Sequence, residues 1–156
     1  MMFLHGLEKE LTKYMIRMNK FSKRSFENLK NIHPNLVAIL VVGVRDCPID
    51  FTITNGVRTT KEQQALYAKG RTKPGKIVTN ADGIKNKSNH QIKDDGFGYA
   101  VDLYPYKNGS VQLNDVDGLK VIAKHLKSVA KDLGINLYWG GDWKFKDYPH
   151  FSLING

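Results

Sequence analysis

The chain is poor in the features that mark several common protein classes. Its 156 residues include one cysteine, Cys47, which excludes an intrachain disulfide and any cysteine-rich zinc module. No apolar run approaches the roughly 18 residues that a membrane-spanning helix needs. Lys9, Glu10 and Lys13 interrupt any apolar segment near the start, so we expect no signal peptide. We therefore expect the chain to be made in the cytosol. There is no internal repeat or linker, and the length suits one domain.

Acidic residues are outnumbered. Lys and Arg total 24 against 15 Asp and Glu, which gives a formal net charge of +9 and a pI near 9.6. Such a charge indicates an anionic partner, and nucleic acid, anionic lipid and an acidic cell-wall polymer all fit it. Hydrophobic residues make up 41% and charged residues 25%, which is typical of a globular domain rather than a disordered chain.

Hydrophobic periodicity predicts helices in the first half of the chain. Residues 2–20 form a basic amphipathic pattern, and we expect residues 1–17 to be a helical extension that caps the domain of residues 18–156. The alternative is a helix that meets an anionic membrane transiently. Three further helices are expected: one from Ser22 or Ser25 to near His33, one capped by Asn35 that stops before Pro48, and one from Thr59 or Thr60 to Gly70.

The second half predicts short strands around one long helix. Asn114 is expected to cap that helix and Gly134 to close it. Residues 71–98 have little periodicity, so this long segment is either functional or badly ordered. The expected strands are residues 51–54, 99–104, 135–139 and, at an edge of the sheet, 149–153. Together these elements predict a single α+β domain.

Three residues at strands or strand edges are candidate metal ligands: His90, Asp102 and His150. Strand alternation places Ala100 and Asp102 on one face, and an acid inside an apolar strand is costly to bury unless it is paired or bound to a metal. A catalytic zinc site uses three such ligands and leaves a fourth position open. A histidine by itself is more often a surface residue or a hydrogen-bonded core residue than a metal ligand.

Asp147 is a candidate general base. It lies three residues before His150, so a metal at His150 would place this carboxylate within reach of an attacking water molecule. The alternative is a solvated acid in a turn beside Lys144 and Lys146.

Several motifs together resemble one peptidase family. The segments 88–90 (SNH), 98–102 (GYAVD) and 147–151 (DYPHF) resemble the zinc motifs of the D-Ala-D-Ala carboxypeptidase and L-alanyl-D-glutamate peptidase group. The closest resemblance is to phage endolysins and bacterial cell-wall peptidases of the L-alanyl-D-glutamate type. Residues 56–59 (GVRT), 63–67 (QQALY) and 139–143 (WGGDW) also resemble the family, over residues 20–153 as a whole.

The resemblance implies a role for each candidate residue. His90, Asp102 and His150 match the ligands of one catalytic zinc ion, and Asp147 matches the carboxylate that activates water. Arg58 matches an arginine that binds a substrate carboxylate or stabilises the oxyanion, and Ser88 matches a serine that contacts substrate or supports a ligand. The implied fold is a small antiparallel sheet that carries the zinc site and packs against helices, as in hedgehog and D,D-peptidase domains. An ion pair for Arg58 and a turn position for Ser88 are the alternatives.

The implied substrate is the peptidoglycan stem peptide, cut between L-Ala and D-Glu for host cell lysis. An endolysin made in the host cytoplasm would reach the wall through holin-type pores, and we expect a monomer that does not bind nucleic acid. A D,D-carboxypeptidase or D-Ala-D-Ala dipeptidase of the same zinc family is the first alternative, because the ligands do not choose the bond. A basic nucleic-acid-binding domain is a distant one.

The sequence departs from the family pattern between the first two ligands. The family usually joins them by a short loop, whereas residues 91–97 here form an insertion. Extra loop length costs little entropy, so we expect the zinc site to survive with this loop at its rim. Asp94 and Asp95 within it are expected to lie in a solvated acidic turn, the alternative being a second, harder cation such as calcium.

Overall fold

The computed structural model describes residues 6–10 and 19–156. Most of the helix expected over residues 2–20 lies outside the described residues; within it, residues 6–10 are helical. The limit between an extension and the domain after residue 17 stays a prediction. In chain order the elements are α2 (Lys23–Asn28), α3 (Pro34–Asp46), β1 (Phe51–Asn55), α4 (Thr60–Ala68), β2 (Ala100–Lys107), β3 (Ser110–Val111), α5 (Val116–Leu133), β4 (Tyr138–Trp139), the 3-10 helix η1 (Gly140–Asp142) and β5 (His150–Ser152).

The sheet is antiparallel, with the order β1-β2-β5-β4, and β3 pairs with the far end of β2. The expected position of the last strand at an edge was wrong. β4 pairs with the outer side of β5 through the register Trp139↔Phe151, so β5 lies between two strands. β5 is therefore an inner strand, and His150 is its first residue.

The helix starts follow local capping chemistry. Ser22 and Thr59 each accept a hydrogen bond from a backbone N–H in the first turn of their helix, as expected. The other two caps lie one or two residues from the predicted ones: His33 caps α3, whose first residue is Pro34, and Asp115 caps α5. A proline suits this first position because its missing N–H would be unpaired there anyway.

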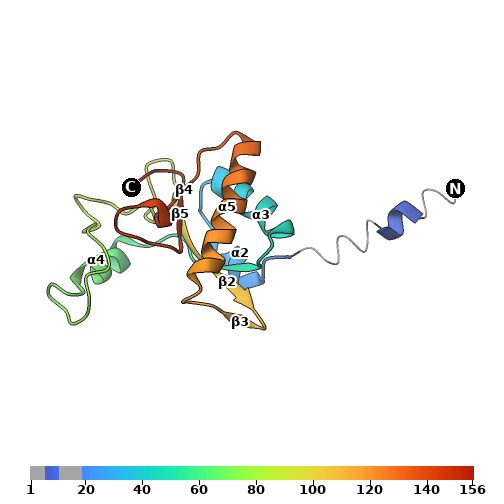
Figure 1. Ribbon diagram of the computed structural model, residues 1–156. Helices are drawn as coiled ribbons and strands as arrows, with labels where there is room; N and C mark the ends of the chain where they lie inside the picture. The colour runs from blue at the N-terminus through green and yellow to red at the C-terminus, as the bar shows by residue number, and fades with distance from the viewer. Residues whose placement is uncertain (1–5, 11–18) are drawn as a thin grey trace.

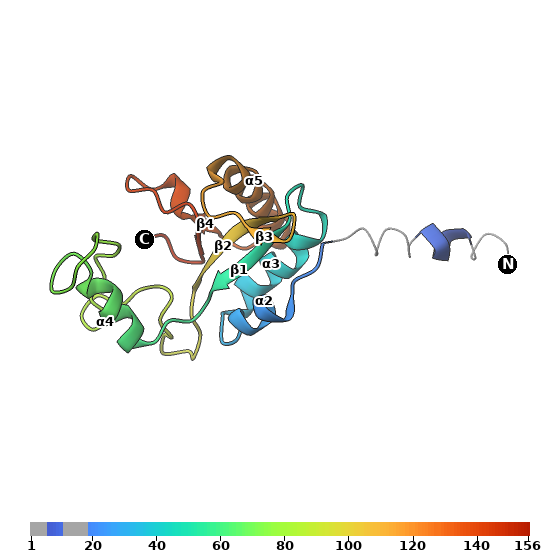
Figure 2. The same ribbon diagram turned by 90° about the horizontal axis from the view of Figure 1, so that it is seen from below.

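Helix α3 packs against α5, and the pair covers one side of the sheet (Figures 1 and 2). α5 presents an apolar stripe to α3 and ends at Gly134, which has a φ of 69° and closes the helix as predicted. The most deeply buried side chains come from both helices and from the strands: Leu36, Ile39, Leu40, Leu119, Ile122, Leu126, Ile53, Val101, Leu103 and Phe151. One core of helices on a small antiparallel sheet confirms the α+β class.

A second part of the molecule stands beside this core. We call α4 and the loop of residues 69–88 the α4 lobe; both views show it extending away from α3 and α5 (Figures 1 and 2). The lobe lies at the end of the sheet where β1 stops and β2 begins, which is also the end that carries Asp102. In the described part of the chain, no helix has the length and hydropathy to cross a membrane.

Candidate metal centre

Strand pairing brings two of the predicted ligands together. β2 and β5 pair antiparallel with Asp102 directly opposite His150, so their side chains leave the same face of the sheet. On its other side Asp102 pairs with Asn55 of β1, where a register shift between Ile53 and Asn55 disturbs the ladder. Sheet register alone therefore fixes two ligands that lie 48 residues apart in the sequence.

The third ligand comes from the loop before β2. The imidazole of His90 is 3% exposed and its Nδ1 lies 3.0 Å from the carbonyl oxygen of Gly56. Its backbone carbonyl accepts a hydrogen bond from the N–H of Arg58 at 2.9 Å. Two contacts to the segment after β1 thus hold the ring, and they aim its other nitrogen, Nε2, at Asp102.

The three side chains form the only group of its kind among the described residues. One ligand atom from each of His90, Asp102 and His150 lies within 4.8 Å of the others. Oδ1 of Asp102 is 3.4 Å from Nε2 of His90 and 3.8 Å from Nδ1 of His150, and the two imidazole rings are 5.0 Å apart at 80°. The 3.8 Å separation between Asp102 and His150 exceeds hydrogen-bond length, and the three side chains together leave a place suited to a shared cation.

The protonation pattern also fits a metal. If Nδ1 of His90 donates to Gly56, Nε2 presents a lone pair to the centre, which is the arrangement common in histidine ligands. Burial and the neighbouring His90 lower the pKa of His150 to about 4, so its ring is neutral at pH 7. Burial acts to raise the pKa of Asp102, but the His90 hydrogen bond and nearby positive charges outweigh it and hold the pKa below its ordinary value. Two imidazoles and one carboxylate match the donors that zinc prefers.

Asp147 lies beside the cluster, as predicted. Its Oδ2 is 3.9 Å from Nδ1 of His150, and its side chain is 49% exposed. The backbone fixes it, since its N–H donates to the carbonyl of Gly140 at 3.0 Å and its carbonyl accepts from the N–H of His150 at 3.1 Å. Burial and the charge of Asp102 raise the pKa of Asp147 to about 6, against the opposing charges of His90 and Arg58. A carboxyl group with such a pKa can take up and release a proton near neutral pH.

Arg58 also faces the cluster. Its Nη2 is 3.8 Å from Oδ2 of Asp102, while Nη1 donates a hydrogen bond to Oε1 of Gln63 at 2.8 Å. The guanidinium is mostly buried, with 17% of the side chain exposed. It therefore offers a positioned cation at the edge of the proposed metal site, and it also forms the long ion pair that the alternative interpretation named.

Ser88 belongs to the turn that carries His90. Its Oγ accepts a hydrogen bond from the N–H of His90 at 3.2 Å, and its own N–H donates to Oε1 of Gln91. The turn position that was the alternative for Ser88 is thus present in the structure. Its contact with the backbone of His90 supports the ligand from behind.

Sequence reasoning missed two buried glutamines. Gln63 is fully buried and its Nε2 donates to Thr79 and to the carbonyl of Ala81. Gln91 is 2% exposed and its Nε2 donates to the carbonyl of Gly83. Both amides bind the loop of the α4 lobe to the site. Gln63 was recognised only as part of the motif at residues 63–67 and Gln91 only as part of the insertion, because glutamine is ordinary in an exposed helix or loop and gives no sign of burial.

Trp143 was also missed as a neighbour of the centre. Its ring lies 4.9 Å from the ring of His150, and its Nε1 donates to Oδ1 of Asn155 at 3.2 Å. The motif containing Trp143 was recognised, but nothing in the sequence placed its ring against the candidate ligand.

The second ring nitrogen of His150 is also notable. On the side away from Asp102, Nε2 of His150 is buried and has no hydrogen-bond partner.

The insertion between the first two ligands folds back on itself. The N–H of Lys93 donates to the carbonyl of Phe97, and Asp95 accepts hydrogen bonds from the N–H of Phe97 and the hydroxyl of Tyr99. Asp94 is exposed. Neither aspartate belongs to a group of three metal-binding side chains in the part of the chain that the structure describes. These contacts agree with the expected acidic turn.

Comparison with known proteins confirms the resemblance predicted from the sequence. The family model described as phage L-alanyl-D-glutamate peptidase matches residues 17–152. The chain is 42% identical over 117 residues to the peptidoglycan L-alanyl-D-glutamate endopeptidase CwlK of Bacillus subtilis (strain 168). This match covers 68% of the chain and 62% of CwlK, which is less than two thirds of that protein. It is 30% identical over 137 residues to the L-alanyl-D-glutamate peptidase of Escherichia phage T5, covering 88% of this chain and 90% of that protein.

A solved structure agrees with these matches. The crystal structure of the Serratia marcescens L-Ala D-Glu endopeptidase ChiX superposes with a TM-score of 0.67 at 28% identity. The match covers 89% of this chain and 92% of that one.

Proposed function

The chain belongs to the phage L-alanyl-D-glutamate peptidase family, and from that membership we propose that it is a zinc-dependent peptidase of bacterial peptidoglycan. The proposed reaction is hydrolysis of the bond between L-alanine and D-glutamate in the stem peptide. The observation that carries the proposal is the convergence of His90, Asp102 and His150 beside a carboxyl group, Asp147, whose pKa is raised to about 6. Cleavage of this bond is also what the names of the similar proteins state.

His90, Asp102 and His150 would hold the zinc ion through Nε2, a carboxylate oxygen and Nδ1. When bound, zinc supplies Lewis-acid chemistry that polarises a peptide carbonyl and makes water more acidic. The chain's own part begins with orientation: the sheet fixes Asp102 and His150, and Gly56 fixes the ring of His90.

Asp147 is the proposed general base. Its half-exposed carboxylate lies beside the cluster, with Oδ2 at 3.9 Å from Nδ1 of His150. From there it takes a proton from the attacking water and later returns it to the leaving amine of D-glutamate. Because the amine leaves as a neutral group, the same carboxyl serves as base and then as acid within one turnover.

Arg58 and Ser88 take supporting roles in this proposal. The guanidinium of Arg58 stabilises negative charge on substrate, either the oxyanion of the tetrahedral intermediate or a stem-peptide carboxylate. Its hydrogen bond to Gln63 fixes the planar group, which lowers the entropy lost when substrate binds. Ser88 holds the backbone of His90 and is itself partly exposed.

Metal analysis together with mass spectrometry of digested peptidoglycan tests the proposal. Purified protein should contain about one zinc ion per chain. Digestion should leave glycan strands whose peptide stems are shortened to a single L-Ala, and it should release peptides that begin with D-Glu. Loss of terminal D-Ala would instead show the D,D-carboxypeptidase or dipeptidase alternative. Full activity after complete chelation would contradict the metal mechanism.

We further propose an endolysin role, in which a monomer made in the host cytoplasm reaches the wall after the inner membrane is opened by holin-type pores. Support comes from the similarity to a peptidase of phage T5 over 90% of that protein. Cytoplasmic expression in a Gram-negative host should leave culture turbidity steady until chloroform permeabilises the membrane, and the turbidity should then fall. Lysis at the same rate without permeabilisation would contradict this route.

A further inference from the structure

The loop between α4 and His90 carries an unusual concentration of positive charge. Residues 69–87, which we call the basic loop, contain six basic residues and a single acidic one, Asp82. All five of its lysines are exposed: Lys69, Lys73, Lys76, Lys85 and Lys87. Within the described ranges, 6–10 and 19–156, none of these lysines has a carboxylate at ion-pair distance. The proposed reaction uses none of them, so their charge is available to another partner.

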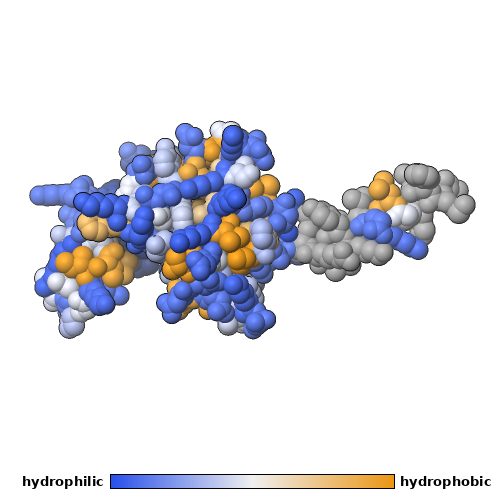
Figure 3. Space-filling view, viewed as in Figure 1, coloured by the Kyte–Doolittle hydropathy of each residue, from blue (hydrophilic) through white to orange (hydrophobic). Residues whose placement is uncertain are grey.

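Exposed aliphatic side chains lie among these lysines. Ile77 and Val78 are each 58% exposed and Ile84 is 60% exposed. The space-filling view shows an apolar patch on the α4 lobe that is bordered by hydrophilic side chains (Figure 3). An exposed surface that mixes cations with apolar groups is suited to a partner with the same alternation, namely carboxylates spaced by methyl and methylene groups.

The basic loop has little regular secondary structure, yet it is fixed by hydrogen bonds. Nη1 of Arg71 donates to the carbonyls of Tyr67 and Thr79 at 2.7 and 3.0 Å, and the guanidinium stacks on the ring of Tyr67. Gln63 holds Ala81, and Gln91 holds Gly83. Anchored at these points, the loop presents its lysines from a defined surface, which lowers the entropy cost of binding.

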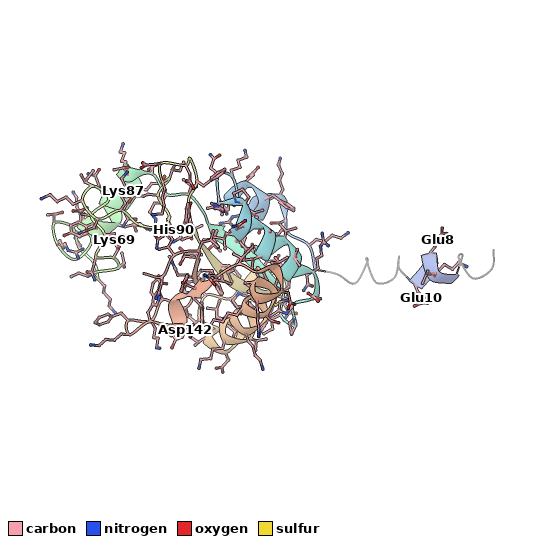
Figure 4. All side chains as sticks on the ribbon, turned by 90° about the horizontal axis from the view of Figure 1, so that it is seen from above. Glu8, Glu10, Lys69, Lys87, His90 and Asp142 are labelled. Carbon is pink, nitrogen blue, oxygen red and sulfur yellow. The ribbon has the colours of Figure 1, made fainter. Side chains whose placement is uncertain are left out.

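This surface borders the proposed metal site. Figure 4 shows Lys69 and Lys87 on the α4 lobe, on the far side of His90 from Asp142. His90 follows Lys87 by three residues in the chain. The side chain of Gln91, next to His90, donates a hydrogen bond to the carbonyl of Gly83 in the basic loop. A polymer whose scissile bond occupies the site would therefore pass over the basic loop.

We propose that the basic loop is a docking surface for the carboxylate-bearing stem peptides of peptidoglycan that flank the peptide being cut. This inference rests on the proposed function, because it takes the substrate to be the cross-linked wall. Free carboxylates along the wall pair with the lysines, while Ile77, Val78 and Ile84 contact the alanine methyl groups between them. The surface thus acts on the polymer, with several carboxylates within about one Debye length, and contributes little to a single soluble peptide.

Matched charge variants test the surface. The triple variant Lys69→Gln, Lys73→Gln, Lys76→Gln removes three charges from the basic loop. Its control, Lys120→Gln, Lys124→Gln, Lys131→Gln, removes three from exposed positions of α5, which packs against α3 in the other part of the molecule. Both sets are exposed, so folding should be retained, and circular dichroism with thermal melts checks this.

Co-sedimentation of the full chain with purified peptidoglycan sacculi is the first measurement. The loop variant should bind roughly tenfold more weakly than wild type at low salt, as expected for three exposed ion pairs, and the α5 variant should bind like wild type. Amidation of the wall carboxylates should remove the difference between wild type and the loop variant. Equal weakening by both variants would overturn the proposal, since it would show an effect of net charge alone.

Further measurements separate this inference from its premise. In the loop variant, hydrolysis of sacculi should fall at least several-fold more than hydrolysis of a soluble stem-peptide fragment. If wild type cleaves peptidoglycan and the two rates fall together, the docking surface is wrong while the proposed function stands. If wild type cleaves neither substrate, the function fails, and sedimentation still decides the surface. Loss of binding to vesicles containing phosphatidylglycerol, with binding to sacculi unchanged, would overturn it in favour of a membrane.

Discussion

Oε1 of Gln63 accepts a hydrogen bond from Nη1 of Arg58 at 2.8 Å, and the Gln63 side chain is fully buried. The other end of the same amide donates to Oγ1 of Thr79 at 3.2 Å and to the carbonyl of Ala81 at 2.8 Å. One side chain from the first turns of α4 therefore orients the guanidinium beside Asp102 and fastens the basic loop. The relationship makes Gln63 a positioning residue rather than a catalytic one.

Gln63→Met should lower both stability and turnover. The change leaves a buried guanidinium nitrogen and the Ala81 carbonyl without partners, which costs about 2 kcal/mol of unfolding free energy. Gln63→Glu keeps the acceptor for Arg58 but sets a carboxylate oxygen against the Ala81 carbonyl, so it should lose stability while retaining more activity than Gln63→Met. Gln64→Met, at the exposed neighbouring position, is the control. Steady-state kinetics and denaturant unfolding measure both effects; equal activities for the Met and Glu variants would contradict the positioning role.

Gly140→Ala should displace Asp147 while the ligands stay in place. A Cβ at Gly140 would lie 2.1 Å from the carbonyl oxygen of Asp147 and 3.0 Å from its Cβ. Because that close neighbour is backbone, it cannot rotate away as a side chain does, and the segment that carries Asp147 must shift. We expect hydrolysis to fall at least about a hundredfold, as for a misplaced catalytic group, with zinc content unchanged. Gly6→Ala, where an added Cβ meets no atom, is the control. Wild-type activity of Gly140→Ala would contradict the role of Asp147.

The sequence predicted the three candidate ligands that the structure brings together, but not how they are supported. The candidate ligands could be predicted for two reasons: a polar residue in an apolar strand is costly to bury, and the motifs of His90, Asp102 and His150 resemble a known family. The position of β5 inside the sheet could not be predicted, since the sequence of a short strand does not indicate how many strands pair with it. Gln63 was equally hidden: its importance depends on burial, which arises from the loop that folds over α4. Tertiary contacts determine both the inner position of β5 and the burial of Gln63, and the local sequence pattern does not encode those contacts.

Removal of zinc should destabilise the protein as well as inactivate it. A metal that binds only the folded chain, at about a thousandfold excess over its dissociation constant, adds roughly 4 kcal/mol to the unfolding free energy. For a domain of this size, that corresponds to a melting temperature about 10 °C higher. His90→Ala should melt at the same temperature with and without a chelator, whereas wild type should lose stability on chelation. Calorimetry with and without the chelator measures this, and a chelator-insensitive wild type would contradict a structural contribution from the metal.

The raised pKa of Asp147 predicts how the metal-free protein responds to pH. Its folded-state pKa of about 6 lies above the ordinary 3.8, so the folded chain holds the proton more tightly than the unfolded chain does. The resulting stabilisation is present below about pH 4 and is lost as pH rises through about 6. Asp147→Asn should therefore stabilise the chelated protein relative to wild type at pH 7.5, and the difference should vanish toward pH 4.

Because about half of the Asp147 side chain is exposed, solvent screening limits this difference to the order of 1 kcal/mol. Urea unfolding of both proteins in chelator, at pH 4, 5, 6 and 7.5, measures it independently of activity. Asp132→Asn, an exposed carboxylate near the end of α5, is the control and should show no such trend relative to wild type. A difference between Asp147→Asn and wild type that stays constant over this range would mean that the Asp147 carboxyl keeps its ordinary pKa. In that case the group would be almost fully ionised near neutral pH, and its return of a proton to the leaving amine there would lose its physical basis.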